Sequence, residues 1–408
     1  MNKEDLSNVQ AVPWYNKNLK LITLLLMVTL FGAIVSWLGF ANSGANFQEL
    51  YNLTIIKHAS ASYLTLSTND DPMPAYLILL SLINQHVPLS LFRVRIISII
   101  IYIFLIGMTF MIGLKSTDRL TGFFSAILVA LSPFIIWYSS RGSVYILLAL
   151  IVVTNQYFFI RILSGKKISW LLYFITGLLG LLLHFIFALI IFAQLLFTFI
   201  YKNEISRHKF VGLLSIIFVY ILAIIGWFYF VPINYHAWQQ LPYTALPSST
   251  NIFILFIQYL FGFQSVVTTT FLIAFWPLLV VVALLAVQKY ISPPLGIQYL
   301  FFSAMVPIGF MFVVSYVFKP LFLSSYLIIS APAFLICIAW YLNAFKLRLL
   351  DLSKYVLIAI MLIMLTLELN SPQRALREDY LGKTIYTSLS VTSYFSKDKL
   401  NNFKFYIP

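Results

Sequence analysis

Charged residues are scarce in this chain. Only 9% of its 408 residues are Asp, Glu, Lys or Arg, and just 12 are acidic, whereas about a quarter of a soluble domain is charged. Hydrophobic residues make up 61% of the sequence, and its mean hydropathy is +0.94. This composition excludes a soluble globular protein and indicates an integral membrane protein.

Cysteine and short chemical motifs are also scarce. The single cysteine, Cys337, excludes a disulfide framework and does not report the redox compartment. The sequence has no Gly-rich phosphate loop, no Cys/His cluster with zinc spacing and no internal repeat. Its long apolar runs lack the alternation of barrel strands, so we expect membrane-spanning helices.

Apolar runs of about 20 residues, the length that crosses a bilayer, recur along almost the whole chain. They predict an all-α polytopic membrane protein with about eleven transmembrane helices. The predicted spans are 20–41, 94–114, 119–138, 144–162, 168–183, 185–202, 211–231, 267–287, 297–317, 323–343 and 354–370. The first follows a polar head and lacks a small-residue cleavage site, so we expect it to be retained. For 170–201, one long helix is the alternative.

The formal net charge of +14 has a topological explanation. With a cytoplasmic amino terminus, 15 of the 26 Lys and Arg residues fall in inner segments, five in outer loops and six in the tail after residue 370. This bias predicts a cell (inner) membrane protein with a cytoplasmic amino terminus and an extracytoplasmic tail, 371–408. Membrane lipids are therefore the expected partners of the positive charge, and nucleic acid is not.

The predicted topology defines a transmembrane helical domain, 1–370, with two long extracytoplasmic connections, 42–93 and 232–266. Residues 77–94 mix apolar and polar side chains, which is typical of an interfacial helix. Long loops held by a rigid bundle commonly carry function, so we expect any chemistry at the outer face.

Two adjacent aspartates, Asp70 and Asp71, lie in the first outer loop within the stretch NDDPMPAY. The prolines at 72 and 74 restrict the backbone that follows and favour a carboxylate held in a fixed place. The alternative is a solvated turn ahead of the prolines.

Several other polar side chains are predicted on the same face. Each has a simpler alternative: interfacial anchoring for Arg95, a loop charge for Arg141, an ordinary outer cap for Lys319, and a structural hydrogen bond for His184.

The order of the outer-face motifs resembles that of the C-type glycosyltransferase (GT-C) superfamily, in the branch of bacterial protein O-mannosyltransferases and aminoarabinose lipid A transferases. The likeness covers about residues 20–385. The matching segments are 47–49 (FQE), 70–76 (DDPMPAY), 95–98 (RIIS), 131–133 (LSP), 137–145, His184, 320–327 with 332–333, and 377–380 (REDY).

The resemblance implies a GT-C-like helical fold and an inverting glycosyltransferase, which moves a hexosyl or pentosyl group from a polyprenyl-phosphate donor. The acceptor would be a glycolipid, polysaccharide or protein on the outer face. A carboxylate would accept the proton of the acceptor hydroxyl, and cations or hydrogen-bond donors would stabilise the departing phosphate. A divalent metal cofactor stays an open question.

The same resemblance assigns roles to residues. The catalytic candidates are Asp70, Asp71 and Glu49; the lipid-phosphate and donor-binding candidates are Arg95, Arg141, Lys319, Tyr326 and His184; the sugar-lining candidates are Tyr76, Tyr138 and Tyr145.

Three family positions with charged side chains differ here, as Gln48, Ser143 and Ser325. Either the donor and acceptor differ from the family norm, or the chain is a weakened relative. Two alternatives therefore stay beside the enzyme: a noncatalytic relative that binds lipid-linked sugar or assists a transferase, and a lipid-linked saccharide carrier or polymerase.

Overall fold

A computed structural model of the chain describes residues 14–41, 47–58, 75–166, 168–230, 246–263, 293–318, 320–344 and 348–369. Within these ranges every regular element is a helix and no strand occurs, which confirms the predicted all-α class. The helices are α1 (Trp14–Ala41), α2 (Phe47–His58), α4 (Ala75–His86), α5 (Leu91–Ser116), α6 (Arg119–Leu131), α7 (Pro133–Ser139), α8 (Val144–Leu163), α9 (Ser169–Leu183), η1 (Phe185–Phe187), α10 (Ala188–Ile200), α11 (Arg207–Phe230), α13 (Ser249–Phe261), α15 (Leu295–Val317), η2 (Tyr326–Ser330), α16 (Ala331–Ala344) and α17 (Arg348–Leu369).

Seven of the described helical segments are long and apolar enough to cross a membrane, and a bent pair, α6 with α7, makes an eighth candidate. The predicted spans 168–183 and 185–202 correspond to α9 and to η1 with α10, which are shorter apolar helices. The predicted span 267–287 lies outside the described residues. The protein is thus a multi-pass membrane protein, while the number eleven stays a prediction.

The predicted span 119–138 is observed as two helices, α6 and α7, with a bend of 63° between them. Pro133 is the first residue of α7, and its ring disfavours helical backbone at the residue before it. Ser132 accordingly leaves the helical region, with φ −64° and ψ 109°, and caps α7 by accepting from the Ile135 N–H. Its hydroxyl also donates to the Tyr259 carbonyl at 2.7 Å, which ties the bend to α13.

The run 170–201 is two helices and not one. His184 adopts an extended conformation, with φ −162° and ψ 133°, and separates α9 from η1. Its Nδ1 accepts the Ile186 N–H at 3.2 Å, which caps the helical turn that follows.

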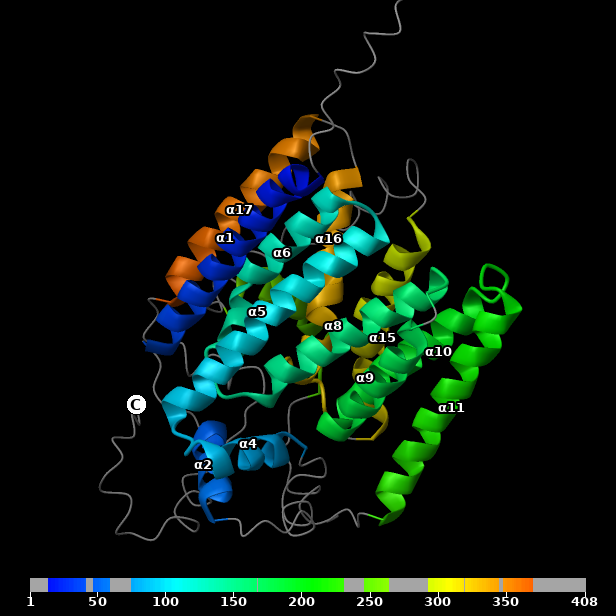
Figure 1. Cartoon of the computed structure of the whole chain (residues 1–408), viewed down its shortest axis with the longest axis horizontal. Helices are drawn as coiled ribbons and strands as arrows, with labels where there is room; N and C mark the ends of the chain where they lie inside the picture. Colours follow the sequence, from blue (N-terminus) through cyan, green and yellow to red (C-terminus); the bar gives the residue numbers. More distant parts are fainter. Residues whose placement is uncertain are drawn as a thin grey trace, which may run out of the picture.

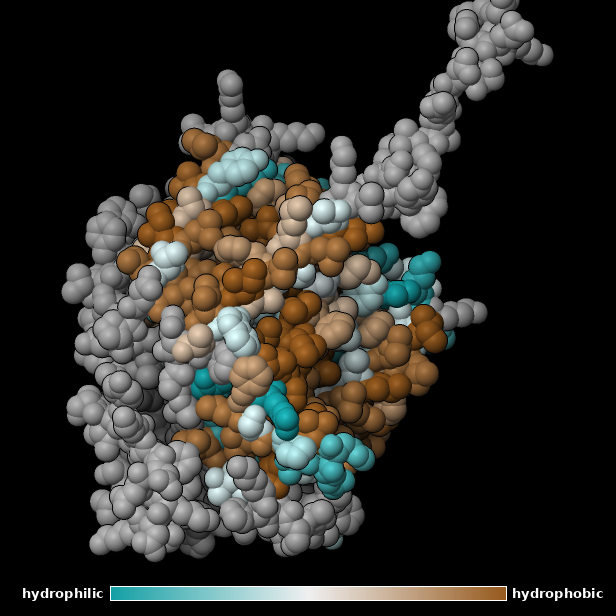
Figure 2. Space-filling model, turned by 60° about the vertical axis from the view of Figure 1, so that its left-hand side comes forward, coloured by the Kyte–Doolittle hydropathy of each residue, from teal (hydrophilic) through white to brown (hydrophobic). Residues whose placement is uncertain are grey.

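The interior of the bundle is formed by α5, which packs against α6 and α8, and by α16, which packs against α6. The α5–α6 contact depends on two glycines: a Cβ on Gly113 would lie 2.7 Å from the Gly122 Cα. Small residues allow such close approach of membrane helices. Figure 2 shows hydrophobic side chains over most of the described surface on one face, as expected for helices that contact lipid.

One end of the bundle carries the short helices α2 and α4, which Figure 1 shows below the long helices. We call it the α2 end. Helix α4 covers the first part of the predicted interfacial helix 77–94 and ends at His86, before α5 begins at Leu91; its interfacial position stays a prediction. A further helix, α13, was not predicted; it packs against α7, α16 and α17.

Candidate functional site

A buried ion pair forms the centre of the α2 end. Arg95 at the start of α5 donates from Nε to Glu49 Oε1 at 2.6 Å and from Nη2 to Glu49 Oε2 at 2.7 Å. Both side chains are only 2% exposed. Two parallel bonds between a guanidinium and a carboxylate fix distance and orientation together, so α2 is held against α5.

The Glu49 carboxylate also binds the turn between α7 and α8. The Gly142 N–H donates to Glu49 Oε1 at 2.8 Å. A Cβ on residue 142 would lie 2.5 Å from Val94 Cγ1 and 3.7 Å from Glu49 Cγ, so a side chain there would push the turn away from the ion pair. Glu49 thus connects three segments that are far apart in the sequence.

Arg141 lies in the same turn and is 6% exposed. The carbon of its guanidinium lies 3.5 Å from the centroid of the Trp137 ring, which is a cation–π contact.

Four predicted site residues form one aromatic cluster beside this turn. The ring centroids of Tyr145 lie 5.6 Å from Tyr138, 5.8 Å from His184 and 6.3 Å from Tyr326. His184 and Tyr326 are 5.4 Å apart. Tyr138 is buried, and the other three are half-buried, so the rings of the cluster are largely shielded from water by one another.

The protonation of His184 defines what it can contribute. Removal from water by burial lowers the pKa of His184 to about 4, so the ring is neutral at neutral pH. Because Nδ1 accepts the Ile186 N–H, the ring proton lies on Nε2. His184 is therefore a hydrogen-bond donor and not a cation at this site.

Tyr76 at the start of α4 is buried near the ion pair. Burial, and then the negative charge of Glu49, raise the pKa of the Tyr76 phenol, and a hydrogen bond with Ser98 opposes this shift. The phenol stays protonated, so Tyr76 can donate a hydrogen bond but cannot serve as a base.

The structure does not cover every predicted residue. Asp70, Asp71 and Lys319 lie outside the described residues, and Gln48 lies on α2. Ser143 caps α8 by accepting the Tyr145 N–H at 3.2 Å, and Ser325 precedes η2. Within the described ranges, no three His, Cys, Asp or Glu side chains gather into a metal-binding group.

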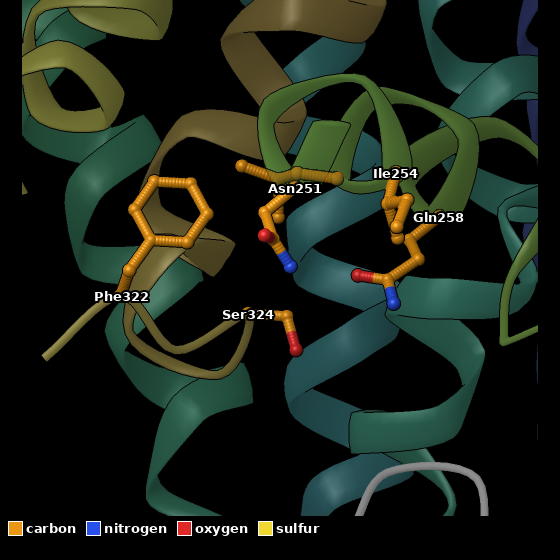
Figure 3. A pocket seen from close by; sticks show the side chains of 6 residues that line it. Asn251, Ile254, Gln258, Phe322 and Ser324 are labelled. Carbon is orange, nitrogen blue, oxygen red and sulfur yellow. The ribbon is translucent and has the colours of Figure 1, made fainter. Parts of the chain in front are cut away.

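Two features of this end were not predicted from the sequence. They are the close approach of the Gly142 backbone to Val94 and the side chain of Gln258 on α13. The side chain of Gln258 lines a hollow formed by α13 and by residues 322–324 (Figure 3). An amide in an otherwise apolar helix, at positions 252–261, was the available signal for Gln258.

The arrangement of the described helices is the GT-C fold, as the resemblance predicted. One similar structure is ArnT from Cupriavidus metallidurans bound to undecaprenyl phosphate: the TM-score is 0.55 and the identity 14%, over 82% of this chain and 63% of ArnT.

A second similar structure is the oligosaccharyltransferase AglB from Archaeoglobus fulgidus, in complex with an inhibitory peptide and a dolichol-phosphate. Its TM-score is 0.52 and its identity 13%, over 90% of this chain and 60% of AglB. The oligosaccharyltransferase of the same organism tethered to an acceptor peptide gives a TM-score of 0.53 at 14% identity, over 95% of this chain and 59% of that one.

The chain thus spans about three-fifths of the length of these proteins. No protein-family model and no curated protein matches the sequence. The likeness therefore defines the fold.

Proposed function

We propose that the protein is a membrane glycosyltransferase that moves a sugar from a polyprenyl-phosphate carrier to a hydroxyl acceptor at the α2 end, which we assign to the extracytoplasmic face. The observation that best supports this proposal is that several candidate residues lie together at one end of a GT-C bundle. They are Glu49, Arg95, the 141–142 turn, Tyr145 and Tyr326. Convergence of distant segments on one face is typical of a binding site.

In the proposed reaction the acceptor oxygen forms a bond to the anomeric carbon from the side opposite the phosphate. The bond between that carbon and the phosphate oxygen breaks, and the configuration inverts. The acceptor proton moves to a carboxylate, and the lipid phosphate leaves with its electron pair. The carboxylate and the groups around the phosphate must both be held in place before the reaction starts.

We assign proton acceptance to Asp70 and Asp71, and positioning to Glu49. The two oxygens of Glu49 accept from Arg95 and from the Gly142 N–H inside the protein, so this carboxylate is committed to holding the α2, α5 and 141–142 segments together. The pair Asp70 and Asp71 follows α2 in the same loop and precedes α4.

The phosphate would be bound by Arg141 and Lys319, with hydrogen bonds from His184 and Tyr326. Arg141 lies over the Trp137 ring, and a guanidinium is suited to two-point contact with phosphate oxygens. Because Arg95 is paired with Glu49 through two bonds, it contributes mainly to the position of Glu49. The faces of Tyr138 and Tyr145, together with the Tyr76 hydroxyl, would contact the sugar.

One observation favours a second candidate, a noncatalytic relative that binds lipid-linked sugar. Glu49, a predicted catalytic carboxylate, is used inside the protein for an ion pair, and its neighbour is Gln48 where the family has an aspartate. Binding without transfer would need the phosphate and sugar contacts alone.

Transfer assays on the full chain in proteoliposomes separate the two candidates. The donor is a panel of undecaprenyl-phosphate sugars with radiolabelled sugar, and the variants are Asp70→Asn, Asp71→Asn and the double variant. Loss of a general base lowers turnover by about a hundredfold or more, with undecaprenyl phosphate binding unchanged. Full activity in the double variant would refute the assignment of Asp70 and Asp71. Binding of undecaprenyl phosphate by a wild-type protein that transfers no sugar would support the noncatalytic candidate.

A further inference from the structure

A small hollow opens between α13 and the segment that leads from α15 into η2. It is lined by Asn251, Ile254, Leu255, Gln258, Phe322 and Ser324. Ser324 lies two residues before Tyr326, which connects the hollow along the chain to the aromatic cluster of the candidate site.

The Gln258 side chain is the exceptional feature of this hollow. It is 4% exposed, and its carbonyl Oε1 is buried and accepts no hydrogen bond from the described residues. A buried amide without a partner costs free energy, so a native structure that contains one requires an explanation. A ligand that donates a hydrogen bond to Oε1 supplies that explanation.

Two further polar residues line the same gap. Figure 3 shows the Asn251 amide turned toward the space that Gln258 borders, with Ser324 below that space and the Phe322 ring on the side away from Gln258. Asn251 Oδ1 already accepts from the Ser248 N–H and hydroxyl, so its Nδ2 is the group available for donation. The hollow therefore offers a donor, an acceptor and a hydroxyl.

This set matches the chemistry of a neutral saccharide. A sugar hydroxyl both donates and accepts, which suits Gln258 Oε1 paired with Asn251 Nδ2, and the C–H face of a sugar ring packs on an aromatic ring such as Phe322. Because none of the six lining residues is charged, the hollow has no group that selects a phosphate. The hollow is small, so it would receive one hydroxyl or hydroxymethyl group of a ring that lies at its mouth.

We propose that Asn251, Gln258, Phe322 and Ser324 form a subsite for a neutral sugar ring, next to the transfer site. Only the origin of that sugar ring rests on the proposed function: the ring belongs either to the donor sugar or to a saccharide acceptor.

Direct binding to the full chain in nanodiscs tests this subsite without any transfer reaction. The probes are glucose, mannose and N-acetylglucosamine, observed by saturation-transfer difference NMR, with inorganic phosphate as a competitor. We expect at least one sugar to bind, phosphate not to displace it, and Gln258→Leu to weaken it at least about fivefold through the lost hydrogen bond. Ser324→Ala should weaken it by a smaller factor.

Gln298→Leu is the matched control, because it makes the same change at the start of α15, away from the hollow. Equal sugar binding by Gln258→Leu and wild type, displacement by phosphate, or no binding of any of the three sugars would each overturn the subsite. Melting curves show whether the Gln258→Leu variant is folded. The substitution removes an amide whose Oε1 has no described partner, so the variant should melt no lower than wild type.

Transfer assays then identify the source of the ring. A higher KM for a saccharide acceptor, with unchanged hydrolysis of the donor by water, assigns the subsite to the acceptor; a parallel fall in donor hydrolysis assigns it to the donor sugar. If wild type binds the sugars with the expected dependence on Gln258 but transfers none, the subsite stands and the proposed transferase function fails.

Discussion

Glu49 and Arg95, 46 residues apart in the chain, pair through two short hydrogen bonds in the interior of the α2 end. Removing one partner of a buried ion pair leaves the other charge uncompensated, which costs about 3–5 kcal/mol. We therefore expect Glu49→Gln to lower the melting temperature strongly in nanodiscs. The double variant Glu49→Leu/Arg95→Met, which removes both charges, should regain most of the loss. A Glu49→Gln variant that melts like wild type but has lost transfer activity would instead identify Glu49 as catalytic.

Gly142 is the second requirement of the same centre. In Gly142→Ala the new Cβ would lie 2.5 Å from Val94 Cγ1, so the turn must shift and the hydrogen bond to Glu49 lengthens. Overpacking of this kind costs about 1–3 kcal/mol, which a melting curve detects. Gly107→Ala in α5 is the matched control, since a Cβ there meets no atom within 4 Å. Equal melting of the two variants would contradict the close packing.

His184 should make stability depend on pH. Its pKa is about 4 in the folded protein and about 6.5 in the unfolded chain. Between these values the unfolded chain binds a proton that the folded protein does not, so stability decreases as the pH falls from about 6.5 to about 4. We expect His184→Gln to flatten the melting temperature over this window. Identical pH profiles for the variant and wild type would show that His184 is not buried as a neutral ring.

Leucine substitution at Gln194 should lower the melting temperature, whereas the same substitution at Gln258 should not. Gln194 donates to Asn155 Oδ1 at 2.8 Å and to the Tyr299 hydroxyl at 2.9 Å, and it accepts from the Tyr173 hydroxyl at 2.8 Å. Gln194→Leu leaves three buried groups without this partner, at about 1–3 kcal/mol for each group left unsatisfied. A lower melting temperature for Gln194→Leu, with none for Gln258→Leu, is the expected result. Equal effects would mean that the two amides have similar surroundings.

The membrane class and most of the helices follow from composition and from apolar runs alone, because any segment that crosses a bilayer must satisfy its own backbone hydrogen bonds. The bend at Ser132 could not be predicted from these apolar runs, because apolar residues continue on both sides of Pro133. Helix α13 was concealed by its aromatic, proline-containing surroundings, although Ser248 and Asn251 form a capping box just before its apolar run.

The candidate site was predictable as a set of segments and not as a set of contacts. The resemblance assigned Tyr138, Tyr145, His184 and Tyr326 to one site, and the structure brings their rings together. The pairing of Glu49 with Arg95 depends on how α2 packs against α5, which no local pattern encodes. The role of Gly142 depends in turn on that pairing.

The short helices beside the site have a consequence for the surrounding bilayer. At 1.5 Å per residue, the 13 residues of α10 and the 15 residues of α9 extend over only about 20 Å, against a hydrocarbon core of about 30 Å. Such hydrophobic mismatch is relieved by local thinning of the membrane, at a cost that rises with the thickness of the bilayer. Beside these helices the lipid headgroups would then lie closer to the centre of the bilayer. The length of the acyl chains in the host membrane would thereby control how easily the proposed lipid-linked donor reaches the site.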